Sequence, residues 1–165
     1  MSVIDFLNQW TGKIVSWLCV VLIGVLCYEV VARFVFNSPT EWAYEVSQEM
    51  GLTIIVMGSG YALLRKAHVR VDVFYKLLPP RGQALVDVLL GVIIFFPVLV
   101  ILIWVSVNRA LFSWSMHEVV QTTFWYPPSW PQRTVMAIGL FLLALQGVAA
   151  FIRDLYFLLR NKRYD

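Results

Sequence analysis

Long, uninterrupted runs of apolar residues dominate the pattern along this chain. Four of them, at about 14–35, 42–64, 84–107 and 134–158, reach the roughly 20 residues that a helix needs to cross a bilayer. Lipid cannot satisfy backbone polar groups, so a membrane-crossing run is helical unless it belongs to a closed barrel, and these runs lack the alternation of barrel strands. The pattern predicts an all-α integral membrane protein with four transmembrane helices, forming one domain over residues 1–165.

The composition agrees with a lipid environment. Hydrophobic residues make up 60% of the 165 residues and charged residues 14%, and the mean hydropathy is +0.75. A soluble domain carries about 45–50% apolar and about 25% charged residues. These values exclude a disordered chain and a nucleic-acid-binding tail. The first apolar run has no basic start and no small-residue cleavage site after it, so we expect it to be kept as a membrane helix.

The basic residues predict the orientation. Ten of the 13 Lys and Arg residues lie at the amino terminus, between runs two and three, or at the carboxyl end from Arg153 onward. Because basic residues are retained in the cytoplasm, both termini and the segment 65–82 are expected there. The short turn at Asn37 and the longer segment 108–133 are then expected on the periplasmic side.

Two shorter segments have the pattern of amphipathic helices. One face of each is apolar and the remaining positions are polar or charged: Val3, Leu7, Trp10 and Ile14 in the first, and Val71, Phe74, Tyr75 and Leu78 in the second. Such helices lie in the membrane plane, with charges among the headgroups. Packing against a partner protein is the alternative for both.

Charged residues gather near the outer ends of the first two runs. Glu29 and Arg33 are spaced i,i+4, as are Glu41, Glu45 and Glu49, so each set shares a helix face. Charge inside a membrane is costly and needs a partner or water. One interpretation is an ion or proton relay. The interpretation we favour is a structural cluster in which Arg33 holds the carboxylates of the second run.

Other chemistry has little support in this sequence. The two histidines, His68 and His117, lie outside the runs and on opposite sides, which argues against a bis-histidine haem or a zinc site. Cys19 and Cys27 are eight residues apart on one helix, too far for a disulfide. There is no phosphate-binding glycine loop. We therefore expect no cofactor in this chain and no enzymatic activity.

Two packing features can be read from the apolar runs. Pro97 lies within the third run and is expected to kink that helix. The pairs Ser47/Gly51 and Gly58/Ala62 are spaced four apart in the second run, which favours close contact with another helix.

The sequence from about residue 14 to 155 resembles the small membrane subunit of tripartite ATP-independent periplasmic (TRAP) transporters, most closely from Arg33 to Asp87. The resemblance rests on the run 33–37, on Trp42 followed by Glu45 and Glu49, and most specifically on the run 60–75. Leu78-Pro79-Pro80-Arg81-Gly82 continues it. Outside the run 60–75, this resemblance and the charge pattern give these structural or subunit-interface candidates: Glu29, Arg33, Trp42, Glu45, Glu49, Leu78 and Arg81. Within that run they give Arg70, Asp72 and Phe74.

The resemblance implies a multi-pass protein of the bacterial inner membrane that acts with two other proteins. One is a large multi-span permease subunit that carries the sodium and solute sites. The other is a periplasmic solute-binding protein that delivers a carboxylate-bearing solute. The small subunit is then a scaffold in contact with lipid and with the large subunit, and no nucleic acid is involved.

Two other functions compete with the scaffold. The first is a self-sufficient four-span transporter that uses Glu29 as a proton-coupled site, although the strong bias of basic residues argues against the dual insertion typical of small exporters. The second is the membrane anchor of a redox enzyme, which the positions of the histidines disfavour.

Overall fold

The computed structural model describes residues 2–65, 79–121 and 124–160, and within them the chain is helical except for its connections. The elements are α1 (Ser2–Phe34), α2 (Ala43–Leu64), α4 (Pro80–Leu90), the π-helical turn η1 (Gly91–Phe95), α5 (Phe96–Met116) and α6 (Trp130–Arg160). The all-α prediction is confirmed for the described residues.

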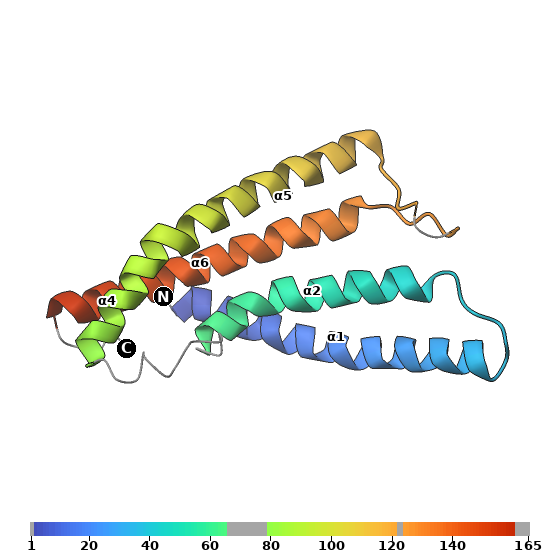
Figure 1. Ribbon diagram of the computed structural model, residues 1–165, viewed down its shortest axis with the longest axis horizontal. Coiled ribbons are helices and arrows are strands. Elements are labelled where there is room, and N and C mark those ends of the chain that lie inside the picture. Colours follow the sequence, from blue (N-terminus) through green and yellow to red (C-terminus); the bar gives the residue numbers. More distant parts are fainter. Residues whose placement is uncertain (1, 66–78, 122–123, 161–165) are drawn as a thin grey trace.

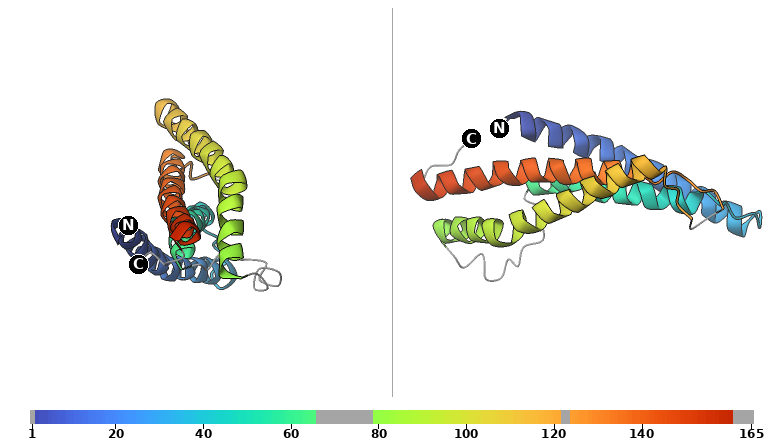
Figure 2. Two further views of the ribbon diagram at one scale, coloured as in Figure 1. Left: turned by 90° about the vertical axis from the view of Figure 1, so that its left-hand side faces the viewer. Right: turned by 90° about the horizontal axis from the view of Figure 1, so that it is seen from above.

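The helices form a row rather than a closed bundle. In Figure 1 the order across the row is α5, α6, α2 and α1, and each helix packs chiefly against its neighbours in that order. The amino-terminal end of α1 also reaches α6. The first residues of α1 and the last residues of α6 lie at the same end of the molecule (Figure 1). The end-on view in Figure 2 shows that the row is bent, so that α5 lies away from α1.

Three of the helices are long and apolar enough to cross a membrane. They span Val3–Phe34, Leu85–Met116 and Trp130–Leu158. The fourth predicted crossing, at 42–64, corresponds to α2, whose first two turns carry Glu45, Gln48 and Glu49. Those polar residues lower its hydropathy, and its crossing remains a prediction.

The predicted start of the first membrane helix, at about residue 14, is wrong. A separate interfacial helix was expected over the segment that ends at Ile14, followed by a new span, but α1 runs unbroken from Ser2 to Phe34. No proline interrupts this stretch, so its helical hydrogen bonds continue. The stripe of Val3, Leu7, Trp10 and Ile14 is nevertheless exposed, as an outer face of the long helix.

The kink expected at Pro97 is present. Pro97 is the second residue of α5, which follows η1, and the helix axis changes direction between α4 and α5 (Figure 2). Proline cannot donate to the carbonyl one turn earlier, and a π-turn at that point absorbs the break. At the start of α4, Pro80 occupies the first helical position, where its missing N–H costs nothing.

The connection between α5 and α6 is shorter than predicted. A loop was expected over 108–133, but α5 continues to Met116 and α6 begins at Trp130. His117 ends α5 in the left-handed conformation, with φ of 49°. The residues between form a small hairpin, which we call the 117–129 hairpin, closed by an antiparallel bridge between Val119 and Pro128.

Of the two glycines expected to allow close helix contact, Gly58 packs on α1, where its Cβ would stand 3.7 Å from a methyl carbon of Val15, and Gly51 does not. No atom lies within 4 Å of where a Cβ of Gly51 would stand, so this glycine makes no close contact with the described part of the chain. The tight approach is between α2 and α6, where a Cβ at Gly139 would stand 3.0 Å from the backbone carbon of Val56. A second tight approach, at Gly60, involves α1.

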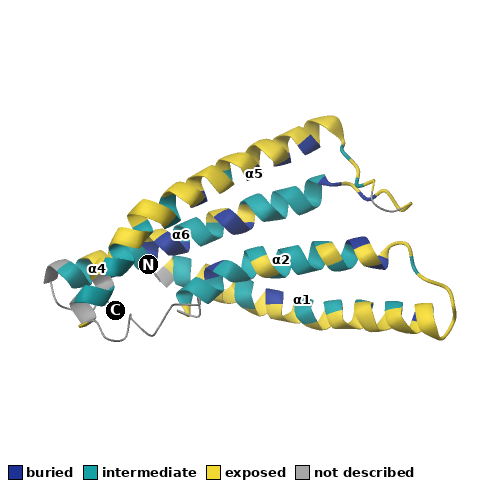
Figure 3. Ribbon diagram, viewed as in Figure 1, coloured by how far each residue is buried: buried dark blue, intermediate teal, exposed yellow. Residues whose placement is uncertain are grey.

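Large apolar side chains mostly face outward. The buried apolar residues are chiefly small, and Figure 3 shows burial concentrated on α6 and on the faces turned toward it, while α1 and α5 are largely exposed. Examples of exposed side chains are Trp17, Ile55, Ile101 and Trp104. Such a surface requires lipid or another membrane protein to cover it.

Candidate functional site

A polar cluster holds the connection between α1 and α2. We call it the turn cluster: Glu29, Arg33 and Thr40. One oxygen of Glu29 accepts hydrogen bonds from Nε (3.0 Å) and Nη2 (2.6 Å) of Arg33. The other accepts the backbone N–H of Thr40 at 3.1 Å and the Thr40 hydroxyl. Four donors thus fix one carboxylate, which ties the end of α1 to the chain entering α2.

The connection itself, residues 35–42, is tightly folded. Asn37 adopts a positive φ of 50°, which ends α1, and the N–H of Ser38 bonds to the carbonyl of Ala32 at 3.0 Å. Trp42, a predicted interface residue, stacks on Tyr28 of α1 with ring centroids 5.9 Å apart. In the structure, Trp42 therefore packs the connection against α1.

The expected pair of Glu29 and Arg33 is confirmed, but the wider cluster is wrong. Arg33 was expected to hold Glu45 and Glu49, yet its side chain is 55% exposed and its ion pair is with Glu29. Glu45 is buried, and its Oε1 has no hydrogen-bond partner among the described residues. Arg33 pairs with its i,i+4 neighbour on the same helix, whereas Glu45 of α2 faces the interior of the row.

A second polar cluster lies at the opposite end of α1. We call it the amide–carboxylate cluster: Asp5, Asn8, Gln146 and Arg153. Asn8 Nδ2 donates to Gln146 Oε1 at 3.0 Å, and Gln146 Nε2 donates to Asp5 Oδ1 at 3.2 Å. Arg153 forms an ion pair with the other oxygen of Asp5. Asn8 and Gln146 are fully buried, so this chain of contacts joins α1 to α6 through their interior faces.

Helix α2 takes part in the same cluster through a glycine. A Cβ at Gly60 would overlap the side-chain oxygen of Asn8, which has no hydrogen-bond partner within the described ranges. The absence of a side chain at Gly60 therefore allows three helices to meet at one buried amide.

Sequence reasoning missed this cluster, although the signal was present. Asp5 and Asn8 are three apart, and Gln146 and Arg153 are seven apart, so each pair lies on one helix face. A polar face on each of two otherwise apolar helices indicates that the two faces meet, because buried polar groups need partners.

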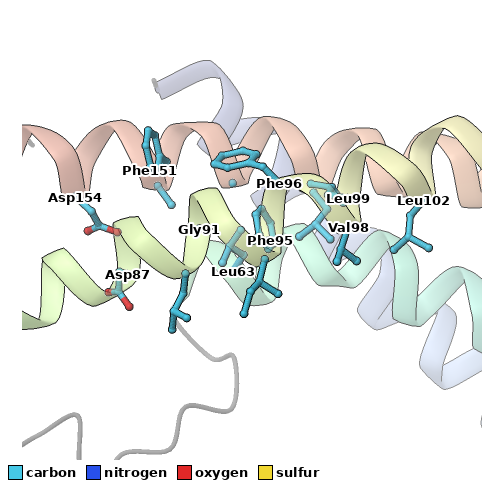
Figure 4. A pocket seen from close by; sticks show the side chains of 15 residues that line it. Leu63, Asp87, Gly91, Phe95, Phe96, Val98, Leu99, Leu102, Phe151 and Asp154 are labelled. Carbon is cyan, nitrogen blue, oxygen red and sulfur yellow. The ribbon is translucent and has the colours of Figure 1, made fainter.

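An apolar groove lies between α5 and α6. It has a volume of about 520 Å³ and runs along η1 and the first turns of α5, with Leu63 of α2 at its floor. Figure 4 shows apolar side chains such as Phe95 and Leu99 along it, and Asp87 and Asp154 at one end. The divergence of α4 and α5 at the π-turn produces this opening.

Several predicted interface residues lie outside the described part of the chain: Arg70, Asp72, Phe74 and Leu78. Arg81 belongs to the first turn of α4, and its side chain is not described. The predicted surface helix at 71–78 is therefore untested. Within the described residues, no group of three or more His, Cys, Asp or Glu side chains could hold a metal ion.

Comparison with known proteins identifies the family. The sequence model described as "Tripartite ATP-independent periplasmic transporters, DctQ component" matches residues 22–156. A sialic acid TRAP transporter permease protein, SiaT of Haemophilus influenzae, is 24% identical over 95 residues, which cover 58% of this chain and 15% of that protein. A sialic acid TRAP transporter small permease protein, SiaQ of Vibrio cholerae, is 26% identical over 62 residues, 38% of this chain and 36% of that protein.

The matched regions thus span well under two thirds of either relative. The family model, in contrast, covers most of this chain, from within α1 to near the end of α6. It includes the turn cluster, the groove and the 117–129 hairpin. The chain belongs to the DctQ family, the small permease subunits of TRAP transporters.

Proposed function

We propose that this chain is the scaffold subunit of a sodium-driven transporter that imports a carboxylate-type organic solute. It would act with a large multi-span permease subunit and a periplasmic solute-binding protein, in the bacterial inner membrane with both termini in the cytoplasm. Family membership supports the partnership, and both curated relatives are named for sialic acid, an organic acid.

The observation that carries this proposal is the row of helices with apolar faces. A self-sufficient transporter encloses its solute site among its own helices, whereas the opening described here is an apolar groove on the side of the row. Side chains such as Ile101 and Trp104 are left for lipid or a partner to cover. A row of this kind offers a long, continuous surface to a larger membrane protein.

The groove is the part of that surface best suited to a partner helix. Its apolar lining from α2, α4, α5 and α6 gives the depth that side-chain packing requires in a membrane, where association depends on close contact. Leu102→Trp, which fills the groove, should reduce recovery of the large subunit with this chain. Leu111→Trp on the same helix α5, exposed and outside the groove, is the matched control.

The turn cluster supports a structural role for Glu29 over the proton-coupled alternative. Both oxygens of its carboxylate are occupied by donors from Arg33 and Thr40, and Glu29 does not line the apolar groove. A carried proton would have to displace these contacts. The cluster instead fixes the connection between two helices.

Reconstituted uptake tests the proposal. Proteoliposomes with the large subunit, this chain and loaded binding protein should accumulate solute under an inward sodium gradient. Omitting this chain should abolish uptake, and this chain alone should transport nothing. Proton-driven transport by this chain alone, lost in Glu29→Gln, would contradict the scaffold and establish the alternative.

A further inference from the structure

The 117–129 hairpin is held in place at its base by several contacts. The N–H of Val120 bonds to the carbonyl of Pro127 and the N–H of Ser129 to that of Glu118, both at 2.8 Å. Below the bridge, Trp114 and Trp130 pack with ring centroids 4.5 Å apart, and Trp114 Nε1 donates to Thr134 at 3.0 Å. These contacts fix the base of the hairpin, at the ends of α5 and α6.

We call residues 124–126 the tip of the hairpin, and all three are aromatic and uncharged. Phe124, Trp125 and Tyr126 are 81%, 47% and 51% exposed. From Val119 to Gln132 the sequence contains no acidic or basic residue. The charges at the base, Glu118 and Arg133, form an ion pair with each other. Three adjacent exposed rings without a charge among them are poorly suited to water and require lipid or another protein to cover them.

Other aromatic residues mark the same end of the molecule. The stacked pair of Tyr28 and Trp42 lies at the first connection, and Trp114 and Trp130 lie at the base of the hairpin. Figure 1 shows both connections at this end, and Figure 3 shows the end of α1 and the hairpin tip as exposed. Trp and Tyr are enriched where the hydrocarbon core meets the headgroups. The hairpin tip continues this ring of aromatic residues.

We propose that the 117–129 hairpin is a membrane-interface anchor. Phe124 and Trp125 insert at the boundary between headgroups and acyl chains, at the end of the molecule that carries the first connection, and the occupant of this surface is lipid. The tip would then fix the depth and tilt of α5 and α6, whose ends it joins. This inference is independent of the solute, of the large subunit and of the side of the membrane on which this end lies.

Site-directed spin labelling tests the anchor in the full-length chain in phosphatidylcholine–phosphatidylglycerol nanodiscs. Cys19 and Cys27 are first replaced by Ala, and single labels are placed by Phe124→Cys and Trp125→Cys. Ile101→Cys, exposed on α5, is the lipid reference, and Ser38→Cys in the first connection is the water reference. The measured quantity is the ratio of collision with oxygen, which concentrates in lipid, to collision with a water-soluble nickel chelate.

We expect the ratio at positions 124 and 125 to be several-fold above that at Ser38 and below that at Ile101, which lies near the middle of its span. A ratio equal to that at Ser38 would place the tip in water and overturn the proposal. Low collision with both reagents, in the chain alone or in its complex with the large subunit, would show that protein covers the tip, and would overturn it as well. Each label replaces one of the two aromatic side chains, so measuring both positions shows whether the result depends on the ring that was removed.

Discussion

The two polar clusters of this protein lie at opposite ends of α1 and connect different things. The turn cluster uses residues 11 positions apart at most, and it fixes the connection that leads into α2. The amide–carboxylate cluster joins residues about 140 positions apart and ties α1 to α6, with Gly60 of α2 beneath it. One cluster shapes a turn, and the other sets which helices are neighbours.

The difference shows where a row of apolar helices obtains its specificity. Lipid-facing side chains attract each other no more than they attract lipid, so close packing and interhelical hydrogen bonds must select the arrangement. The amide–carboxylate cluster supplies both, because its buried amides need partners and its glycine allows close approach. We expect the fold to depend more on this end than on the other.

The sharpest test of the comparison asks whether the two clusters lie on opposite sides of the membrane. Single cysteines at Ser38 and Lys66, which flank α2, are treated on intact cells with an impermeant maleimide in the background lacking Cys19 and Cys27. Ser38→Cys should label fully, and Lys66→Cys should label only after permeabilisation. The reason is that position 66 lies on the side that carries most of the basic residues, which is expected to be the cytoplasm. Equal labelling of both would show that α2 does not cross, and would remove the fourth span.

Gly60→Val should give the largest loss of stability among single substitutions. The new side chain would overlap Asn8 and break its hydrogen bond to Gln146, and overpacking typically costs about 1–3 kcal/mol. The readout is the thermal midpoint of the purified chain in nanodiscs. Gly51→Val on the same helix meets no atom within 4 Å and is the control. If both variants melt alike, the three helices do not meet as described.

The ion pair of Asp5 with Arg153 should show measurable coupling. A double-mutant cycle with Asp5→Asn and Arg153→Gln should give an interaction energy of about 1 kcal/mol, at the lower end for contacting residues because both side chains are partly exposed. Additive losses would mean that this pair does not contribute to joining α1 and α6.

Glu29→Gln should have the smallest effect on stability. The loss should remain below that of Asp5→Asn, because the turn cluster is local and Tyr28 still stacks on Trp42. Uptake by the complete complex should be retained. Normal assembly with lost uptake would contradict the structural role, and it would favour the relay that the carboxylate pattern also allowed.

Much of the fold was readable from the sequence because its signals are local. Apolar length located the long helices, Pro97 located the kink, and i,i+4 spacing located the pair of Glu29 with Arg33. Helix ends were less well predicted. Nothing in the stretch around Ile14 marks a break, and only the left-handed conformation of His117 ends α5.

The remaining features depend on which helices become neighbours. The order of the row decides that Asn8 meets Gln146 and that Glu45 faces inward rather than toward Arg33. Spacing along one helix gives the face of a residue but not the helix opposite it. The groove between α5 and α6 likewise results from the π-turn before Pro97, whose geometry the sequence does not specify.

Affinity purification of this chain from its native membrane tests the central claim most directly. If the chain is a scaffold subunit, a large multi-span permease should be recovered with it in constant proportion, and Leu102→Trp should lower that recovery while Leu111→Trp should not. Recovery of the chain without a second membrane protein, in a form that transports solute unaided, would contradict the account.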